Sequence, residues 1–153
     1  MAYVVTASEP FEKKRPGQFR RSIFLAGAID MGAAVDWQSY VIGALRDDHI
    51  TIVNPRRANF DETTLDEQIH WELEALENVD FIFMWFPKDS KAPISFFEAG
   101  IYLKSGKLII GAEHGFYRRR NLEITTSRYH VSLHDSIQSM LAMLFRRLEL
   151  DKD

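Results

Sequence analysis

The sequence predicts an α/β protein with a doubly wound, parallel, five-stranded sheet and helices on both faces. Three observations lead to this prediction. Apolar runs of strand length alternate with segments of helical periodicity, the connections between them are short, and the run FIFMWF is apolar at every position. Short strand–helix alternation is typical of parallel sheets, and an unbroken apolar strand indicates burial on both faces.

Five segments have the composition of strands. SIFLAGAI (22–29) ends in small residues, and ITIVNP (50–55) is stopped by a proline. FIFMWF (81–86) is the third strand and KLIIGAE (107–113) the fourth. RYHVSL (128–133) is rich in strand-forming residues, so we expect a fifth strand there, at an edge of the sheet.

Four helices are expected between and after these strands. Their apolar spacing predicts helices over residues 34–48, 63–79, 95–106 and 135–149. The second helix begins with the capping-box pattern Thr64-x-x-Glu67, and Gly106 ends the third. We expect one domain over residues 1–153, with residues 1–21 as an N-terminal extension or loop.

Composition excludes several classes of function. A net charge of −3 argues against a general affinity for nucleic acid, and the absence of cysteine excludes disulfides, thiolate metal sites and a cysteine nucleophile. No signal peptide or 18-residue apolar span is present, so we expect a cytoplasmic protein with no membrane partner. The five histidines lack metal-ligand spacing, and neither GxGxxG nor a P-loop occurs, so we expect no metal site and no dinucleotide or triphosphate site.

The ligand site is expected at the carboxyl ends of the strands, near the point where the strand order reverses. The loops at this edge are 27–33, 54–62, 86–94 and 112–120. Two glutamates near these loops occupy positions that the pattern marks as apolar. Carboxylates in apolar surroundings cost free energy unless they are paired, protonated or open to a cavity.

Glu72 is the first of these glutamates. Leu65, Ile69 and Leu76 stand at i, i+4 and i+11 of a helical stripe, and Glu72 stands at i+7. Glu72 therefore falls on or beside the core-facing stripe. The alternative is a rim glutamate that bonds to nearby backbone or to an arginine.

Glu98 is the second, within the segment PISFFEAG. Ser95-x-x-Glu98 matches a capping box, so Glu98 can simply cap its helix. Alternatively, a carboxylate in the first helical turn is kept ionised by the helix dipole, which suits a nucleophile. We expect Ala99 and Gly100 to let this helix approach the sheet closely.

Two such carboxylates can cleave a glycosidic bond. One attacks the anomeric carbon and the other protonates the leaving group. In this chain Glu98 would be the nucleophile and Glu72 the acid/base.

Other residues at the expected ligand edge have two interpretations each. Asn54 and Arg56 either form a turn with solvated arginines or contact a base or an acidic group. The basic run Arg118–Arg120 is either solvated or holds a phosphate. Trp85 either packs in the core or stacks on a planar ligand.

Taken in order, FLAGAI, NPRR, QIHWELEALENVDFIFMWF and PISFFEAG resemble the nucleoside 2-deoxyribosyltransferase family, most closely its divergent second branch, over about residues 22–125. The resemblance implies a flavodoxin-like fold. It also implies exchange of the base of a 2′-deoxynucleoside through a covalent deoxyribosyl–glutamate intermediate, without a cofactor. The substrates would be nucleosides and nucleobases.

The resemblance also assigns residues. The nucleophile of the family motif corresponds to Glu98, and the acidic residue eight positions before Asp80 corresponds to Glu72. Asn121 matches an asparagine that a neighbouring subunit supplies to the sugar, which implies a homo-oligomer, a dimer or hexamer, with shared active sites. The other expected substrate-binding residues are Phe24, Gly27, Asp30, Asn54, Arg56, Trp85 and Ser95.

The chain departs from the family pattern at three positions. Phe24 stands where many members have tyrosine, and Glu72 stands where aspartate is usual. Ala92 replaces the aspartate that holds the 5′-hydroxyl group, for which Asp89, Ser90 or Ser95 can substitute. Two alternatives therefore stay open: an N-glycosidase (hydrolase) acting on 2′-deoxynucleoside 5′-monophosphates, and a nucleotide-binding module without turnover.

Overall fold

Six strands form one sheet in the order β1-β3-β2-β4-β5-β6 in the computed structural model, which describes residues 1–7, 9, 21–29, 35–56 and 64–150. They are β1 (Tyr3–Thr6), β2 (Arg21–Gly27), β3 (Ile50–Asn54), β4 (Phe81–Phe86), β5 (Leu108–Ala112) and β6 (Leu133–His134). Strand β3 pairs in parallel with β1 and β2, and β5 pairs in parallel with β6. Without β1, this is the flavodoxin-like order, which reverses between β2 and β4. The predicted doubly wound parallel sheet is confirmed, with six strands instead of five.

Two strand predictions were wrong. Strand β1 lies within residues 1–21, which we expected to be an extension or loop, and its register pairs Tyr3 with Thr51 and Thr6 with Asn54. The expected edge strand at 128–133 is reduced to Leu133–His134. Most of the residues before it belong to the end of a helix and to the turn that follows.

The described residues form five helices. They are α1 (Trp37–Leu45), α2 (Leu65–Asn78), α3 (Pro93–Tyr102), α4 (Arg119–Arg128) and α5 (Ile137–Leu150). Four correspond to predicted helices with shifted ends, and α4 was not predicted. Within the described ranges, no helix is both long enough and apolar enough to cross a membrane.

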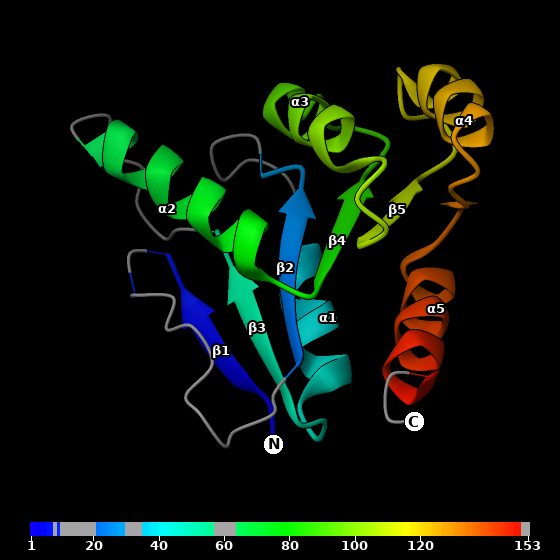
Figure 1. Ribbon diagram of the computed structural model, residues 1–153. Coiled ribbons are helices and arrows are strands. Elements are labelled where there is room, and N and C mark those ends of the chain that lie inside the picture. The colour runs from blue at the N-terminus through cyan, green and yellow to red at the C-terminus, as the bar shows by residue number, and fades with distance from the viewer. Residues whose placement is uncertain (8, 10–20, 30–34, 57–63, 151–153) are drawn as a thin grey trace. The chain divides into compact units, whose positions relative to one another are not determined.

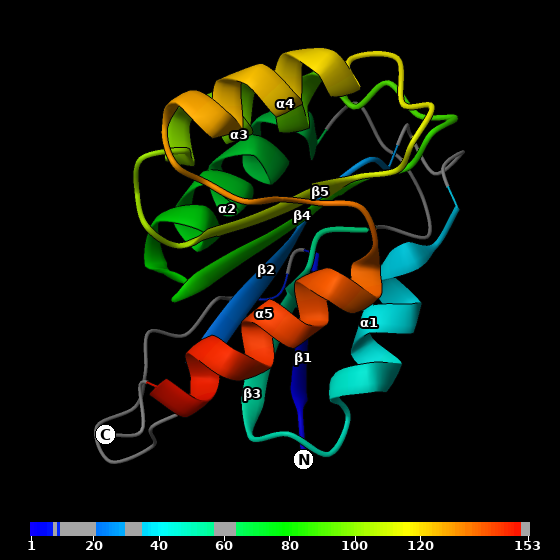
Figure 2. The same cartoon turned by 90° about the vertical axis from the view of Figure 1, so that its right-hand side faces the viewer.

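The chain divides into two compact units, and the first comprises Met1–Leu25 and Asp36–Ile82. Helices α1 and α2 cover opposite faces of strands β2 and β3 (Figures 1 and 2). The start of β2 is joined to the residue before β4, because the Asp80 Oδ2 atom accepts hydrogen bonds from the Ser22 amide at 2.8 Å and the Ser22 hydroxyl at 3.1 Å. This junction fixes where α2 ends and β4 begins.

The second unit comprises Ala26–Val35 and Phe83–Asp153. Helices α3 and α4 lie on one face of β5, and α5 lies on the other (Figure 2). Every residue of β5 is buried, as expected for a strand covered on both faces. Gly111 in this strand gives room to its neighbours, since a Cβ atom there would lie 2.7 Å from the Met140 sulfur atom.

Candidate active site

The carboxyl ends of β2, β4 and β5 are adjacent in the second unit. The Ala28 amide donates a hydrogen bond to the Trp85 carbonyl oxygen at 3.3 Å, and the Glu113 amide donates to the Phe86 carbonyl oxygen at 2.9 Å. The loops after β4 and β5 also meet, because the Lys88 amide donates to the Glu113 carboxylate at 3.4 Å. Three of the predicted ligand-binding loops therefore begin at one edge of the sheet, beside the point where strand order reverses.

Gly27 is the last residue of β2 and lies against β4. Its φ angle is +126°, and a Cβ atom on it would lie 2.1 Å from the Trp85 carbonyl oxygen. No residue with a side chain fits there without moving backbone, which explains the glycine of the FLAG motif. Asp30, expected to bind substrate from the loop that follows, lies outside the described residues.

Glu98 lies on α3, which follows the loop after β4. The residue is buried, with 8% of its surface exposed. The helix begins at Pro93, and its N-cap is Ala92 in the left-handed conformation, with φ of 49°. Ser95 is therefore already the third helical residue, so the capping-box interpretation of Ser95 and Glu98 is wrong.

The same helix boundary corrects a second expectation. Glu98 lies in the second turn of α3 rather than the first, and the effect of the helix dipole falls off beyond the first turn. The dipole therefore stabilises the ionised carboxylate less than we expected. Burial in the unit that holds the three strand ends is the feature that distinguishes Glu98.

The outer face of α3 is apolar. Ile94 is 63% exposed, Phe97 71% and Ile101 51%. Gly100 belongs to this exposed face and a Cβ atom on it would have nothing within 4 Å, so our expectation that it lets the helix approach the sheet was wrong. Ala99, on the inner face, is buried as expected.

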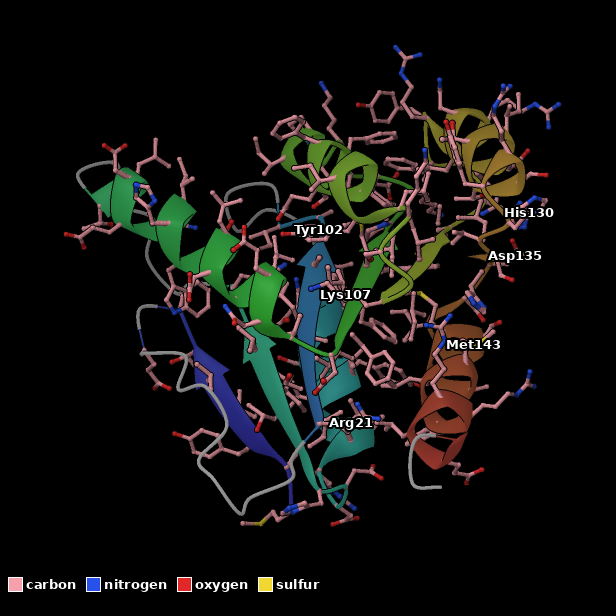
Figure 3. The ribbon with its side chains drawn as sticks, in the orientation of Figure 1. Arg21, Tyr102, Lys107, His130, Asp135 and Met143 are labelled. Carbon is pink, nitrogen blue, oxygen red and sulfur yellow. The ribbon has the colours of Figure 1, made fainter. Side chains whose placement is uncertain are left out.

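Two kinds of contact hold α3 in place: aromatic packing on its inner face, and a cation–π contact at its carboxyl end. The Phe96 ring centroid lies 5.2 Å from that of Phe86 and 5.8 Å from that of Phe116. The Lys107 ammonium group lies 5.1 Å from the centroid of the buried Tyr102 ring (Figure 3). These contacts hold the helix that carries Glu98 and Ser95, a second buried polar residue one turn earlier.

Glu72 lies on α2, in the first unit. Ala75 and Leu76, at i+3 and i+4 from it, are fully buried, so Glu72 shares their side of the helix as predicted. It is partly buried, and its Oε1 atom accepts a hydrogen bond from the Gln68 Nε2 atom at 3.2 Å. The expected stripe was wrong in its first turns, where Leu65 and Ile69 are exposed.

Phe24 and Trp85 are both buried in the β-sheet. The Phe24 ring lies 6.4 Å, centroid to centroid, from the Trp71 ring, whose Nε1 atom donates to the Glu9 carbonyl oxygen at 2.6 Å. The Trp85 ring lies against Gly111, since its Cε3 atom is 3.0 Å from the point where a Cβ atom would stand. Both side chains therefore contribute to packing, and substrate contact by either one stays a prediction.

Arg56 follows the carboxyl end of β3. Its backbone amide donates to the Asn54 Oδ1 atom at 3.1 Å, and its Nε atom donates to the Gln38 Oε1 atom at 3.2 Å. The Arg56 side chain is 14% exposed, so the solvated-arginine interpretation is wrong for this residue. Sequence reasoning missed Gln38. It lies on the buried stripe of α1 with Val41 and Leu45, and a polar residue on such a stripe is the same signal that singled out Glu72.

The basic run Arg118–Arg120 lies before and within α4, and its central residue, Arg119, has a mainly structural role. The Arg119 guanidinium group bonds the Ala112 carbonyl oxygen and Asp135, which lies between β6 and α5 (Figure 3), and its Nε atom lies 3.1 Å from Glu123. The hydrogen bond from Arg119 holds the pKa of the Asp135 carboxyl group below its ordinary value.

The exposed parts of the run lie on either side of Arg119. The Arg118 guanidinium carbon is 5.5 Å from the centroid of the Tyr117 ring, and Arg120 pairs with Glu123 at 2.9 Å. Asn121 is exposed on α4, and its assignment to the sugar site of a neighbouring subunit stays a prediction.

Comparison with known protein families gives a match that covers the candidate site. A family model described as nucleoside 2-deoxyribosyltransferase like matches residues 20–116, well over half of the chain. A search of curated proteins finds no match to the chain. The matched range includes β2 to β5 and both glutamates, Glu72 and Glu98. The chain therefore belongs to the nucleoside 2-deoxyribosyltransferase-like family.

Proposed function

We propose that the protein is a nucleoside 2-deoxyribosyltransferase, which moves the deoxyribosyl group of a 2′-deoxynucleoside from one nucleobase to another. The observation that carries the proposal is the burial of Glu98 on α3, in the unit where the carboxyl ends of β2, β4 and β5 are adjacent. Membership of the family gives this position its chemical meaning. A carboxylate held on a packed helix is suited to act as a nucleophile at a fixed sugar carbon.

In the first half-reaction, the Glu98 carboxylate attacks C1′ of the deoxyribose. The C1′–N bond breaks, its electron pair passes to the base nitrogen, and the Glu72 carboxylic acid gives a proton to the departing base. The products are a glycosyl ester on Glu98 and a neutral base. Glu72 is now ionised.

In the second half-reaction, a nitrogen of the incoming base attacks C1′ and the ester bond to Glu98 breaks. The Glu72 carboxylate takes the proton that this nitrogen loses. Two displacements at C1′ give net retention of configuration. Glu72 carries both proton transfers and Glu98 carries the deoxyribosyl group, so the reaction as proposed needs no cofactor.

We further propose that the protein acts as a homo-oligomer. The outer face of α3, formed by Ile94, Phe97 and Ile101, carries no charged side chain and exposes large apolar groups. Such a stripe is complementary to itself across a twofold axis, and its burial is favourable. Asn121 of a second copy would complete the sugar site.

A hydrolase acting on 2′-deoxynucleoside 5′-monophosphates is the second candidate. Ala92 stands at the position of the family's usual aspartate and is the N-cap of α3. Because Pro93 has no amide N–H, the first backbone donors of the helix are the amide groups of Ile94 and Ser95. Amide groups at a helix N-terminus suit a phosphate. In the basic run, Arg119 is committed to protein groups, which leaves the exposed Arg118 to assist.

The product pattern tests the proposal. We would incubate the protein with deoxyinosine, deoxycytidine or deoxyuridine, with and without free adenine, and separate the products by chromatography. A new deoxynucleoside that depends on adenine is the expected result. Free base alone, above all from the 5′-monophosphate, would establish the hydrolase. No product from any substrate would support a nucleotide-binding module without turnover.

A further inference from the structure

Gln38 is a buried amide in the first turn of α1 with an unmatched donor. None of its surface is exposed, and its Oε1 atom accepts a hydrogen bond from the Arg56 Nε atom at 3.2 Å. Its Nε2 atom is buried and has no hydrogen-bond partner among the residues that the structure describes. A buried donor without a partner costs folding free energy, and such groups in native proteins commonly have a functional reason.

The contact with Gln38 fixes the direction of the Arg56 guanidinium group. The Arg56 Nε atom faces Gln38, with the Asp36 Oδ1 atom at 3.6 Å, and the Asn54 side chain holds the Arg56 backbone amide. A guanidinium group is a rigid planar fork, so fixing the Nε edge fixes the direction of both Nη atoms.

This cluster lies at the carboxyl end of β3, on the edge where parallel sheets bind ligands. Its recognition atoms would be the Arg56 Nη groups and the Gln38 Nε2 atom, all of which are donors. The Asp36 side chain, 48% exposed, partly compensates the charge of Arg56. Neutral acceptors such as carbonyl oxygens and ring nitrogens therefore fit better than a phosphate.

We infer that Gln38 is a positioning residue for Arg56, and that the two side chains together read acceptor atoms on the edge of a nucleobase. The inference rests on the proposed function for the identity of the ligand. What is new is that recognition of the base depends on Gln38. The free-energy cost of the unmatched amide is then offset when a base is bound.

Binding of free nucleobases to the full chain tests the inference without turnover. We would measure the affinities of adenine, hypoxanthine, cytosine and uracil by calorimetry for the wild type and for Gln38→Met, Arg56→Met and the double variant. Loss of a hydrogen bond to a charged group predicts an affinity about tenfold weaker in each single variant. The affinity loss in the double variant should be smaller than the sum of the two single losses, because Gln38 acts in part through the position of Arg56.

Two further variants separate positioning from a merely structural role. Gln38→Glu keeps an acceptor for the Arg56 Nε atom and should recover part of the lost affinity. Ser39→Ala lies in the same turn of α1 and loses only the exposed bond between its hydroxyl and Asp36, so it should leave base affinity unchanged. In turnover assays, Gln38→Met should raise KM for the acceptor base much more than it lowers kcat.

The outcomes distinguish this inference from the proposed function. Unchanged base affinity in Gln38→Met, or losses that add in the double variant, would overturn the positioning role and leave the transferase standing. Unchanged affinity in Arg56→Met would overturn the recognition role of the pair. A wild-type chain that binds no nucleobase would overturn both the inference and the proposed function.

Discussion

The backbone of Gly27 meets that of Trp85 so closely that a Cβ atom on residue 27 would lie 2.1 Å from the Trp85 carbonyl oxygen. We predict that Gly27→Ala lowers the free energy of unfolding by at least about 3 kcal/mol, because the clash is with backbone and the φ angle is +126°. Urea denaturation measures the loss. Gly43→Ala is the control, since a Cβ atom there meets nothing within 4 Å and the helical position favours alanine by up to about 1 kcal/mol. Equal stability of the two variants would contradict the account of this strand end.

The apolar face of α3 predicts self-association. Phe97→Ser should shift the protein from oligomer to monomer in sedimentation experiments, while its folded state is kept, because Phe97 is 71% exposed. Phe145→Ser on α5, a less exposed phenylalanine, should leave the oligomer intact. A wild type that is already monomeric at assay concentrations would remove this role from α3.

Two elements could not be predicted because tertiary contacts override their local sequence. Strand β1 has four residues, of which only Val5 is buried, and it exists because it pairs with β3. Helix α4, RRNLEITTSR, is polar and contains β-branched residues, so it has no apolar stripe to predict it. The network of Arg119 with Ala112, Glu123 and Asp135 holds it.

In the site, too, some features could be predicted from sequence patterns and others depend on tertiary structure. Glu72 lies on the side of α2 that carries the buried Ala75 and Leu76, as helical spacing predicts, whereas Leu65 and Ile69 of the predicted stripe are exposed. The start of α3 was misplaced because Ser95-x-x-Glu98 imitates a capping box, whereas the chain uses Pro93 as first helical residue and Ala92 in a left-handed conformation. Nothing in the local sequence signals a positive φ angle at an alanine.

His134 makes stability depend on pH. Burial lowers its pKa from the ordinary value of 6.5, and the Asp135 charge opposes this only in part. The folded state therefore binds the proton less readily than the unfolded state, so stability is full above about pH 6.5 and falls as the pH drops toward the lowered pKa. Urea unfolding at about pH 7.5 and about pH 5.5 should show a smaller difference in His134→Gln than in the wild type. An unchanged difference would contradict the assignment to His134.

Glu72 should control protonation of the base rather than attack on the sugar. We predict that Glu72→Gln lowers the transfer rate by roughly 10²–10⁴-fold, because the departing base then leaves without general acid catalysis. A leaving group that needs no proton should be cleaved by this variant almost as fast as by the wild type. Glu67→Gln, at an exposed position of the same helix, is the control and should retain activity. Loss of both reactions alike would contradict the acid/base role.

The central claim is that Glu98 forms a covalent bond to the sugar, and peptide mass spectrometry tests it directly. The protein would be incubated with a nucleoside carrying a 2′-fluorine, which destabilises the oxocarbenium-like transition state and slows breakdown of the intermediate. The protein would then be digested. We expect a glycosyl adduct on Glu98 that disappears when adenine is added, and no adduct or turnover in a folded Glu98→Gln variant. Turnover by that variant at near the wild-type rate, or an adduct on another residue, would contradict the claim.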